Sequence, residues 1–365
     1  MTSIRDDLEA LMLLPGLSGH EERVASAIRT RLDAMGLAHR TDRLGNVIAT
    51  LDGDPQAPTV MLFTHMDQLG FITRRITDDG FIQVERMGGV PERALAGQAV
   101  LLCVGEGRDV PAIITNKAHH ATTPDEKYQV VRAPDLIIDA GFASKADAEA
   151  AGVRIGTPIV YRPHVMTLGD HRVAGTSVDD RAGCAVQLAV AAALSGHSNR
   201  PTVHVVFSVQ EEFNLRGAVV AAQAIKPDIA IQIDLMLASD TPDMVDRADM
   251  HLGGGPGISL YSFHGRGTLN GVIPHPAMVQ LMEESADALS MPLQRSAQVG
   301  VLTDLSYDQL VGEGVASVDV GFPMRYSHSA LECCDVRDLE ALGKLLEHAI
   351  SQIGPDFQLT REARP

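Results

Sequence analysis

The chain has 365 residues, of which 45% are hydrophobic, and carries a formal net charge of −17 at pH 7. A chain of this length can bury a large core and is expected to form two domains rather than one. The acidic balance leaves no basic patch for phosphate groups, so nucleic acid is excluded as a partner. Charged residues interrupt every apolar run, and residues 1–7 lack a signal-peptide pattern. We therefore expect no membrane association and a cytoplasmic location.

Cysteine usage agrees with a reducing compartment. The four cysteines have no CxxC spacing, and the adjacent pair Cys333-Cys334 is poorly placed for an ordinary disulfide. We expect all of them to be reduced thiols.

The first predicted helix runs from about residue 19 to 35. Ser18 and Glu21 have the spacing of a capping box, and apolar residues follow at helical intervals up to Met35, before Gly36. Strands are expected near 45–51 and 58–64.

The pattern of the sequence changes between residues 70 and 165. Short β-like runs alternate there with glycine and proline turns, and one helix is expected at 144–151. The runs are 70–76, 81–87, 98–103, 111–115, 136–138 and 159–161. This pattern predicts a small β-rich domain at 70–165, inserted into a host formed by 1–69 and 166–365.

The host resumes with alternating helices and strands. A helix at 180–193, a strand at 202–209, a helix at 215–225 and a strand at 229–234 contain a βαβ unit, which favours a parallel sheet. A helix near 275–289, a strand near 315–320 and a helix near 336–353 complete it. The predicted fold class is α/β, with a mixed, mostly parallel sheet flanked by helices.

Five polar clusters stand out against this pattern, and three of them come directly after strand-like runs. The clusters are His65-Met66-Asp67, Asp179-Asp180, Glu211-Glu212, Asp234 and His328. The carboxyl ends of parallel strands meet at one edge of a sheet, where ligand sites form. Two histidines with three or four carboxylates suit a pair of divalent ions better than a single one. The sequence therefore predicts a metallohydrolase.

The residue types suggest a division of roles. His65 can bind metal while Asp67, two residues on, orients its ring. Two neighbouring ions need a shared anionic group, for which Asp179 is the candidate, with Asp180 in support. Taken alone, each cluster is also compatible with a surface turn or a helix cap.

The remaining clusters complete the set. Of Glu211 and Glu212, one can bind metal and the other can act as general base. Asp234 can serve as a terminal ligand, and His328 follows an expected loop at 323–325. A strand-end aspartate is often only a cap, and a single histidine is often structural.

Several segments together resemble the tetrahedral (TET) aminopeptidases, a family of co-catalytic dizinc exopeptidases that includes glutamyl aminopeptidases. The segments are 64–71, 177–184, 209–218 and 325–329, with further landmarks at 138–141 and 155–158 in the inserted domain. The likeness covers essentially the whole chain.

The resemblance implies a ligand set. One ion would be held by His65, Asp179 and Asp234, and a second by Asp179, Glu212 and His328. Glu211 would be the general base and Asp67 would orient His65.

The resemblance also implies an activity and an assembly. Two divalent ions per subunit, zinc in preference to cobalt or manganese, would support removal of N-terminal residues from peptides by a bridging water that Glu211 activates. The inserted domain would mediate dimerisation, and six dimers would form a dodecamer. Residues 300–305 depart from the Gly/Ala-rich segment of many relatives, which leaves the substrate preference open.

Three alternatives remain at this point. A metal-dependent amidohydrolase or deacylase would use the same ligands on N-acyl amino acids or amino sugars. A glycosidase would use Glu211 and Glu212 as paired carboxylates, although adjacent strand residues face apart. A non-enzymatic scaffold would carry a vestigial site. No GxSxG or HExxH motif offers a competing chemistry.

Overall fold

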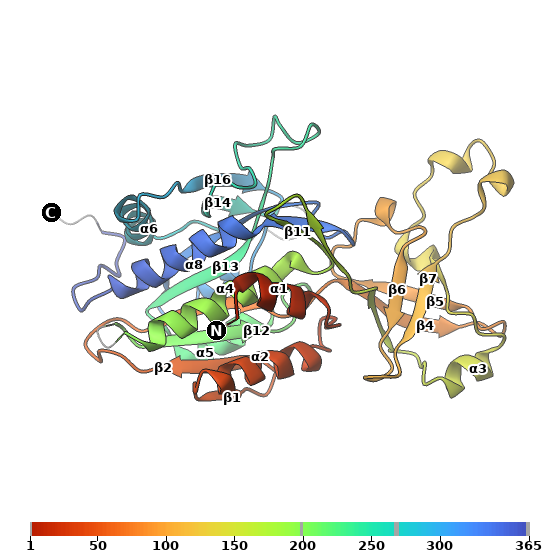
Figure 1. Ribbon diagram of the computed structural model, residues 1–365, viewed down its shortest axis with the longest axis horizontal. Helices are drawn as coiled ribbons and strands as arrows, with labels where there is room; N and C mark the ends of the chain where they lie inside the picture. Colours follow the sequence, from red (N-terminus) through yellow and green to blue (C-terminus); the bar gives the residue numbers. More distant parts are fainter. Residues whose placement is uncertain (1, 198–199, 266–269, 363–365) are drawn as a thin grey trace.

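The computed structural model describes residues 2–197, 200–265 and 270–362. Figure 1 shows an α/β domain and, at one end of the long axis, a separate small β-barrel. The helices are α1 (Ile4–Met12), α2 (Glu22–Ala34), α3 (Lys145–Ala150), α4 (Val178–Ser195), α5 (Gly217–Ile225), α6 (Pro276–Ala288), α7 (Leu305–Asp308) and α8 (Val336–Ser351).

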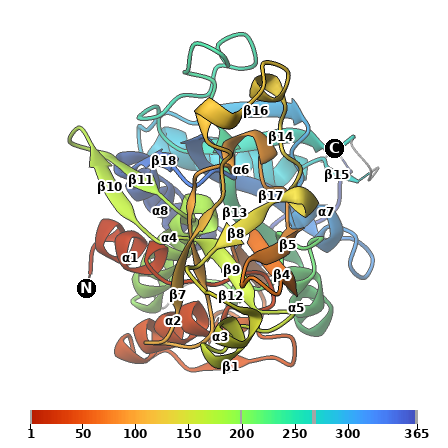
Figure 2. The same cartoon turned by 90° about the vertical axis from the view of Figure 1, so that its right-hand side faces the viewer.

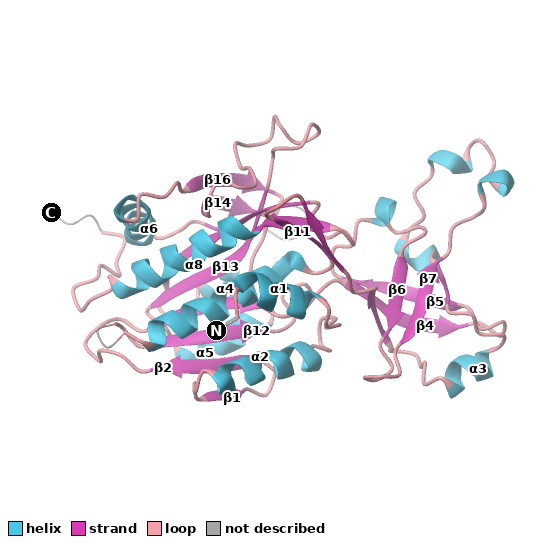
Figure 3. Ribbon diagram, viewed as in Figure 1, coloured by secondary structure: helices cyan, strands magenta, loops and turns pink. Residues whose placement is uncertain are grey.

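The α/β domain is built on a 12-stranded mixed sheet (Figure 3). Its main path runs β1 (His39–Thr41), β2 (Val47–Leu51), β12 (Val203–Ser208), β3 (Val60–His65), β13 (Ile229–Leu237), β17 (Ala316–Arg325), β18 (Glu332–Asp335), β11 (Arg172–Gly175) and β10 (Val165–Leu168). A side branch on β17 holds β14 (Gly257–Phe263), β15 (Gly271–Val272) and β16 (Gln294–Val299). The central strands β12, β3, β13 and β17 are parallel, so their carboxyl ends lie along one edge.

Both faces of the parallel strands are buried, as their nearly continuous apolar sequences require. Alternate residues of β3 point to opposite sides: Val60 and Leu62 pack in the large core with α1, α2, α4, α6 and α8. Met61 and Phe63 pack in a second core with residues of α5 and with Leu305 of α7. The sheet therefore lies between two helical layers.

The small domain is a closed antiparallel barrel of six strands (Figure 2). The strands are β4 (Gly70–Ile76), β5 (Ile82–Met87), β6 (Ala99–Leu102), β7 (Val110–Ile114), β8 (Ile137–Asp139) and β9 (Pro158–Tyr161). They enclose a core of their own, which includes Phe71, Val100 and Ile138. Only residues 66–69 separate β3 from β4, so the barrel begins where the parallel strands end.

The predicted fold class is confirmed, including all six short strands of the inserted region. Several elements were not predicted: helices α1 and α7 and strands β1, β10, β11, β14, β15, β16 and β18. The expected loop at 323–325 is wrong, because β17 continues to Arg325. Its last residues pair with β13 on one side and with Cys333 and Cys334 of β18 on the other. Strand β13 likewise continues past Asp234 to Leu237.

The predicted capping box at Ser18 is also wrong. Helix α2 begins after Glu21, which makes no side-chain cap hydrogen bond. The Ser18 hydroxyl instead donates to Asp67 Oδ2 at 2.5 Å. The hydroxyl group that the sequence spacing predicts as a helix cap is thus hydrogen-bonded to a buried carboxylate.

Within the described ranges, no helix is long and apolar enough to cross a membrane. The four cysteines are all free, as predicted.

Candidate active site

The carboxyl edge of the parallel strands brings all seven predicted site residues together. His65 is the last residue of β3, Asp67 follows it, and Asp234 lies in β13. Asp179 stands at the start of α4, and the remaining three follow strands: Glu211 and Glu212 after β12, and His328 after β17. Residues more than 250 positions apart in sequence therefore share one site.

Asp179 lies between the two histidines. Its Oδ1 is 3.0 Å from His65 Nε2, and its Oδ2 is 3.6 Å from His328 Nε2. One carboxylate thus presents one oxygen to each imidazole, which is the arrangement that a group shared by two ions requires.

Two groups of side chains offer ligand atoms that lie within 4.8 Å of one another. One group is His65, Asp179 and Asp234, and the other is Asp179, Glu212 and His328. These are the two sets that the sequence resemblance implies, and they share Asp179. Imidazole nitrogens and carboxylate oxygens suit zinc, cobalt or manganese.

The charge of the site also fits cations. The ion pairs formed by the ligand candidates join histidines to carboxylates, and no described lysine or arginine takes part. Burial and the neighbouring Asp179 raise the pKa of Glu212 to about 8, against the opposing effect of His328. Burial and Asp179 likewise raise the pKa of Asp234 to about 7. Divalent ions bound beside these carboxylates would stabilise their ionised forms.

Asp67 contacts more than the histidine beside it. Its Oδ1 lies 3.3 Å from His65 Nδ1 and also accepts the backbone N–H of Glu211 at 3.0 Å. Its Oδ2 accepts the backbone N–H of Glu212 at 3.1 Å, together with the Ser18 hydroxyl. Asp67 therefore holds the backbone of both glutamates and lies beside a ring nitrogen of His65.

Glu211 lies over the His65 side of the site. Its Oε2 is 3.9 Å from His65 Nε2, and only 8% of the residue is exposed. Burial raises its pKa well above the ordinary value; His65 opposes this shift, while Glu212, Asp234 and Asp304 add to it. A carboxyl group with a raised pKa is suited to accept and return a proton near neutral pH.

His328 is held by groups that sequence reasoning missed. Its Nδ1 is 3.0 Å from the carbonyl oxygen of Gly89, a residue that follows β5 of the barrel. A ring N–H donated to that carbonyl leaves Nε2 free to bind a metal. Its backbone N–H donates to Glu332. A single glutamate before two cysteines, in a run that is buried in the sheet, was the available sequence signal for Glu332.

Asp180 supports the site from beneath and belongs to neither ligand group. It is fully buried, accepts a hydrogen bond from the Thr64 hydroxyl, and accepts the Gly183 backbone N–H at 3.0 Å. Burial raises the pKa of Asp180 well above the ordinary value.

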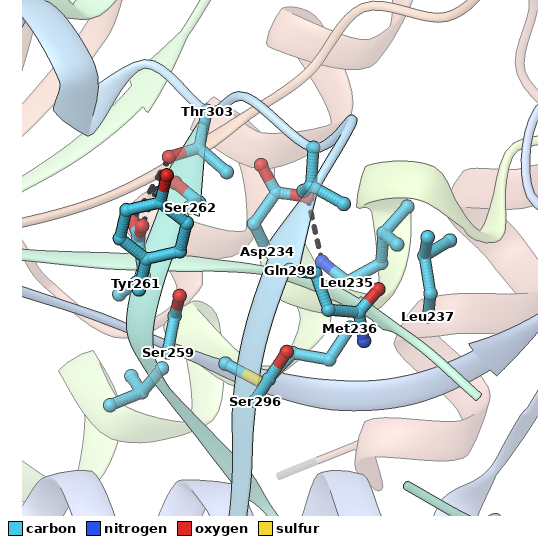
Figure 4. Close-up of a pocket in the computed structure, with 13 residues that line it drawn as sticks. Asp234, Leu235, Met236, Leu237, Ser259, Tyr261, Ser262, Ser296, Gln298 and Thr303 are labelled. Atoms are coloured by element: carbon cyan, nitrogen blue, oxygen red, sulfur yellow. Dashed lines mark hydrogen bonds between the residues drawn. The ribbon is translucent and has the colours of Figure 1, made fainter. Parts of the chain in front are cut away.

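The ligand groups form one wall of a cavity of about 550 Å³. The same cavity is also lined by the apolar side chains Leu235, Leu237, Val301 and Leu302. A smaller space of about 20 Å³, room for about one water molecule, lies against Asp234 on the side of β14 and β16 (Figure 4). Ser262 Oγ and Gln298 Nε2, which border it, are buried and have no hydrogen-bond partner among the described residues.

Two adjoining groups of histidine and carboxylate side chains at the carboxyl edge of a parallel sheet are the arrangement expected of a metallohydrolase. A family model described as M42 glutamyl aminopeptidase matches residues 45–345. The chain belongs to this family, and the predicted resemblance is confirmed.

Relatives that align with nearly the whole chain are named as aminopeptidases. The putative aminopeptidase SgcX of Escherichia coli (strain K12) is 36% identical and covers 100% of this chain and 99% of the relative. The lysyl aminopeptidase of Pyrococcus furiosus is 31% identical, and the alignment covers 94% of this chain and 96% of the relative.

Solved structures agree with the fold. The aminopeptidase APDkam598 from the archaeon Desulfurococcus kamchatkensis superimposes with a TM-score of 0.90 at 32% identity, covering 97% of this chain and 96% of that one. The TET1 peptidase of Pyrococcus horikoshii, which can assemble into a tetrahedron or a large octahedral shell, gives 0.86 at 26% identity, with 96% and 100% covered. The predicted activity, a metal-dependent aminopeptidase, is confirmed at the level of the family.

Proposed function

We propose that this protein is a dinuclear metallo-aminopeptidase. His65, Asp179 and Asp234 would hold one divalent ion, and Asp179, Glu212 and His328 the other. The observation that carries the proposal is the position of Asp179, whose two oxygens face the two histidines from opposite sides. Zinc is the favoured metal, and cobalt or manganese would suit the same N/O ligands.

Divalent ions in these positions would polarise the scissile carbonyl and lower the pKa of a water molecule. Glu211 would act as general base, taking a proton from the attacking water and returning it to the leaving amine. Asp67 would keep His65 and the glutamate backbone in place during this transfer. The carboxylates of the site would also attract the free α-amino group of a peptide, which explains exopeptidase activity.

The cavity wall supports a preference for an apolar N-terminal residue. Leu235, Leu237, Val301 and Leu302 offer hydrocarbon surface, and none of the described cavity-lining residues is a lysine or arginine. A glutamyl side chain would lose hydration beside these four hydrocarbon side chains. We expect leucyl substrates to be cleaved with a higher kcat/KM than glutamyl substrates.

The experiment is a panel of aminoacyl amides and peptides with free or acetylated N-termini. It is run after metal removal and stepwise return of zinc, cobalt or manganese. Cleavage of free N-termini that reaches its maximum at two equivalents of metal supports the proposal. Cleavage confined to acetylated substrates would identify a deacylase instead, and activity that survives chelation would reject metal catalysis altogether.

We also propose that residues 70–165 form a dimerisation domain and that dimers assemble to a dodecamer. The support comes from the closed barrel at one end of the molecule and from the tetrahedral assembly of the similar TET1 peptidase. Sedimentation velocity on the intact protein tests this, since a monomer at micromolar concentration would reject it. A cytoplasmic location is proposed as well, in agreement with the four free thiols.

A further inference from the structure

Glu332 is a buried carboxylate that joins two parts of the site. It is the first residue of β18 and is only 2% exposed. Its Oε2 accepts the backbone N–H of Asp179 at 3.0 Å, and its Oε1 accepts the backbone N–H of His328 at 2.7 Å. Each oxygen of this one carboxylate therefore holds the main chain of a different ligand candidate.

The two ligands that Glu332 contacts belong to the same metal group. Asp179 and His328 are two of the three members of the group completed by Glu212. Glu332 makes no corresponding hydrogen bond to His65 or Asp234 in the described part of the chain. Asp179 is shared with the other group, so the contact to His328 is the one that is specific to the His328 side of the site.

The backbone that Glu332 holds is irregular on both sides. His328 has a φ of 69°, and Ser177, two residues before Asp179, has a φ of 61°. Residues other than glycine adopt this left-handed region only when their surroundings impose it. Hydrogen bonds from N–H groups to a carboxylate are stronger than those to a neutral acceptor, so Glu332 can impose such a conformation.

We propose that Glu332 is a positioning residue for the second metal site, setting the distance between the Asp179 and His328 main chains. Glu332 belongs to neither ligand group and acts through the main chains of the two ligands. The inference rests on the dinuclear function proposed above. Removing the hydrogen bond to His328 would loosen this ion alone, whereas removing the one to Asp179, which belongs to both groups, would loosen this ion more than the ion at His65 and Asp234.

The test is the change Glu332→Gln. An amide has one acceptor oxygen, so one of the two backbone N–H groups would face an NH₂ donor instead. Zinc is titrated into the metal-free protein by calorimetry, and cobalt absorption spectra follow the geometry of each ion. Loss of a partner that orients metal ligands typically costs about 10- to 100-fold in affinity. We expect that loss for the second equivalent of zinc and a smaller weakening of the first, because Asp179 belongs to both ligand groups.

The matched control is Asp338→Asn. Asp338 is 1% exposed and likewise accepts two backbone N–H groups, those of Gly253 at 2.7 Å and Gly255 at 2.8 Å. It belongs to neither ligand group, so its loss should lower the Tm and leave both zinc equivalents unchanged. Glu332→Asp, which keeps the charge but is too short to hold both main chains, provides a second variant if the amide variant fails to fold.

Each outcome decides one question. Unchanged binding of both equivalents in the Glu332 variants would overturn the inference. Equal weakening of both ions, together with a larger fall in metal-free Tm than in the Asp338 control, would show that Glu332 stabilises the fold in general. That outcome would also overturn the inference. A wild-type protein that binds fewer than two ions would instead reject the dinuclear function, independently of Glu332.

Discussion

The two histidines of the site are held in different ways. His65 is 1% exposed, ends a central strand and is oriented by the carboxylate of Asp67. The side chain of His328 is 37% exposed, lies in a loop and is oriented by a backbone carbonyl from the barrel. The His65 side therefore belongs to the core of one domain, whereas the His328 side exists only where two domains meet. We expect the ion on the His328 side to bind more weakly and to exchange first.

The largest effect should come from Glu211, which belongs to neither ligand group and is the proposed general base. Glu211→Gln removes the proton acceptor and keeps the shape, so turnover should fall by about 100- to 10,000-fold. Both zinc equivalents should remain, because Glu211 belongs to neither ligand group. Steady-state kinetics combined with metal analysis measures this. Turnover close to that of the wild type would remove Glu211 from the mechanism.

Asp67→Asn should damage both sides to a similar degree, whereas changes at Glu332 should damage mainly the His328 side. The amide keeps one acceptor oxygen, so one of the backbone N–H groups of Glu211 and Glu212 would face an NH₂ donor instead. It also weakens the contact that orients His65. We expect each zinc equivalent to bind about 10- to 100-fold more weakly. Calorimetric titration separates the two, and an effect on the second equivalent alone would contradict the role of Asp67 at His65.

The metal-free protein should lose stability as the pH rises. The pKa values of about 8 for Glu212 and about 7 for Asp234 lie above the ordinary values of 4.5 and 3.8. The folded protein therefore keeps protons that the unfolded chain releases above about pH 4. Burial lowers the pKa of His328, but Glu212, Asp179 and Glu332 raise it to about 9. The contribution of His328 to the stability of the fold is therefore fully present below pH 6.5 and is lost as the pH rises towards 9.

Both contributions have the same sign. The Tm of the metal-free protein should fall by at least about 5 °C between pH 5 and 9, and that of the zinc-loaded protein should change much less. Calorimetric scans across this range measure the difference. A metal-free Tm that rises with pH would contradict the assigned shifts.

The smallest effect should come from Gly89→Ala. A Cβ at Gly89 would lie 3.1 Å from His328 Nδ1 and 3.3 Å from its Cε1, so the imidazole must move by a few tenths of an ångström. We expect the second zinc equivalent to weaken by only a few-fold, below the range typical of a lost orienting partner. Gly354→Ala, where a Cβ would meet nothing within 4 Å, is the control. Weakening of the first equivalent instead would contradict the difference between the two sides.

Much of this arrangement was predictable from the sequence, because strands and their ends leave local signals. The alternation of the barrel strands and the apolar run before His65 each identify an element without knowledge of its neighbours. The interior position of Asp234 in β13 was not predictable. It depends on pairing with β17, where Asp234 lies opposite Gly321, a residue 87 positions further along the chain.

The groups that position the metal-ligand candidates were the hardest to predict. The contact of His328 with Gly89 is made by a backbone carbonyl, which leaves no residue-type signal in the sequence. Ser18 gave a misleading signal, since serine before a helix is typical of a cap, and only tertiary packing directs its hydroxyl to Asp67. Side chains that bind the ions have a recognisable chemistry, whereas the groups that orient them are specified by the fold.

The barrel is joined to the site at two points. The chain enters it five residues after His65, and it contacts His328 through the carbonyl of Gly89. It thus has a covalent anchor beside one imidazole and a hydrogen-bonded anchor at the other. Replacing residues 70–165 with a short linker would consequently not yield a miniature enzyme. The sheet would keep its two helical layers, but the second imidazole would lose its support, so the inserted domain is a component of the active site.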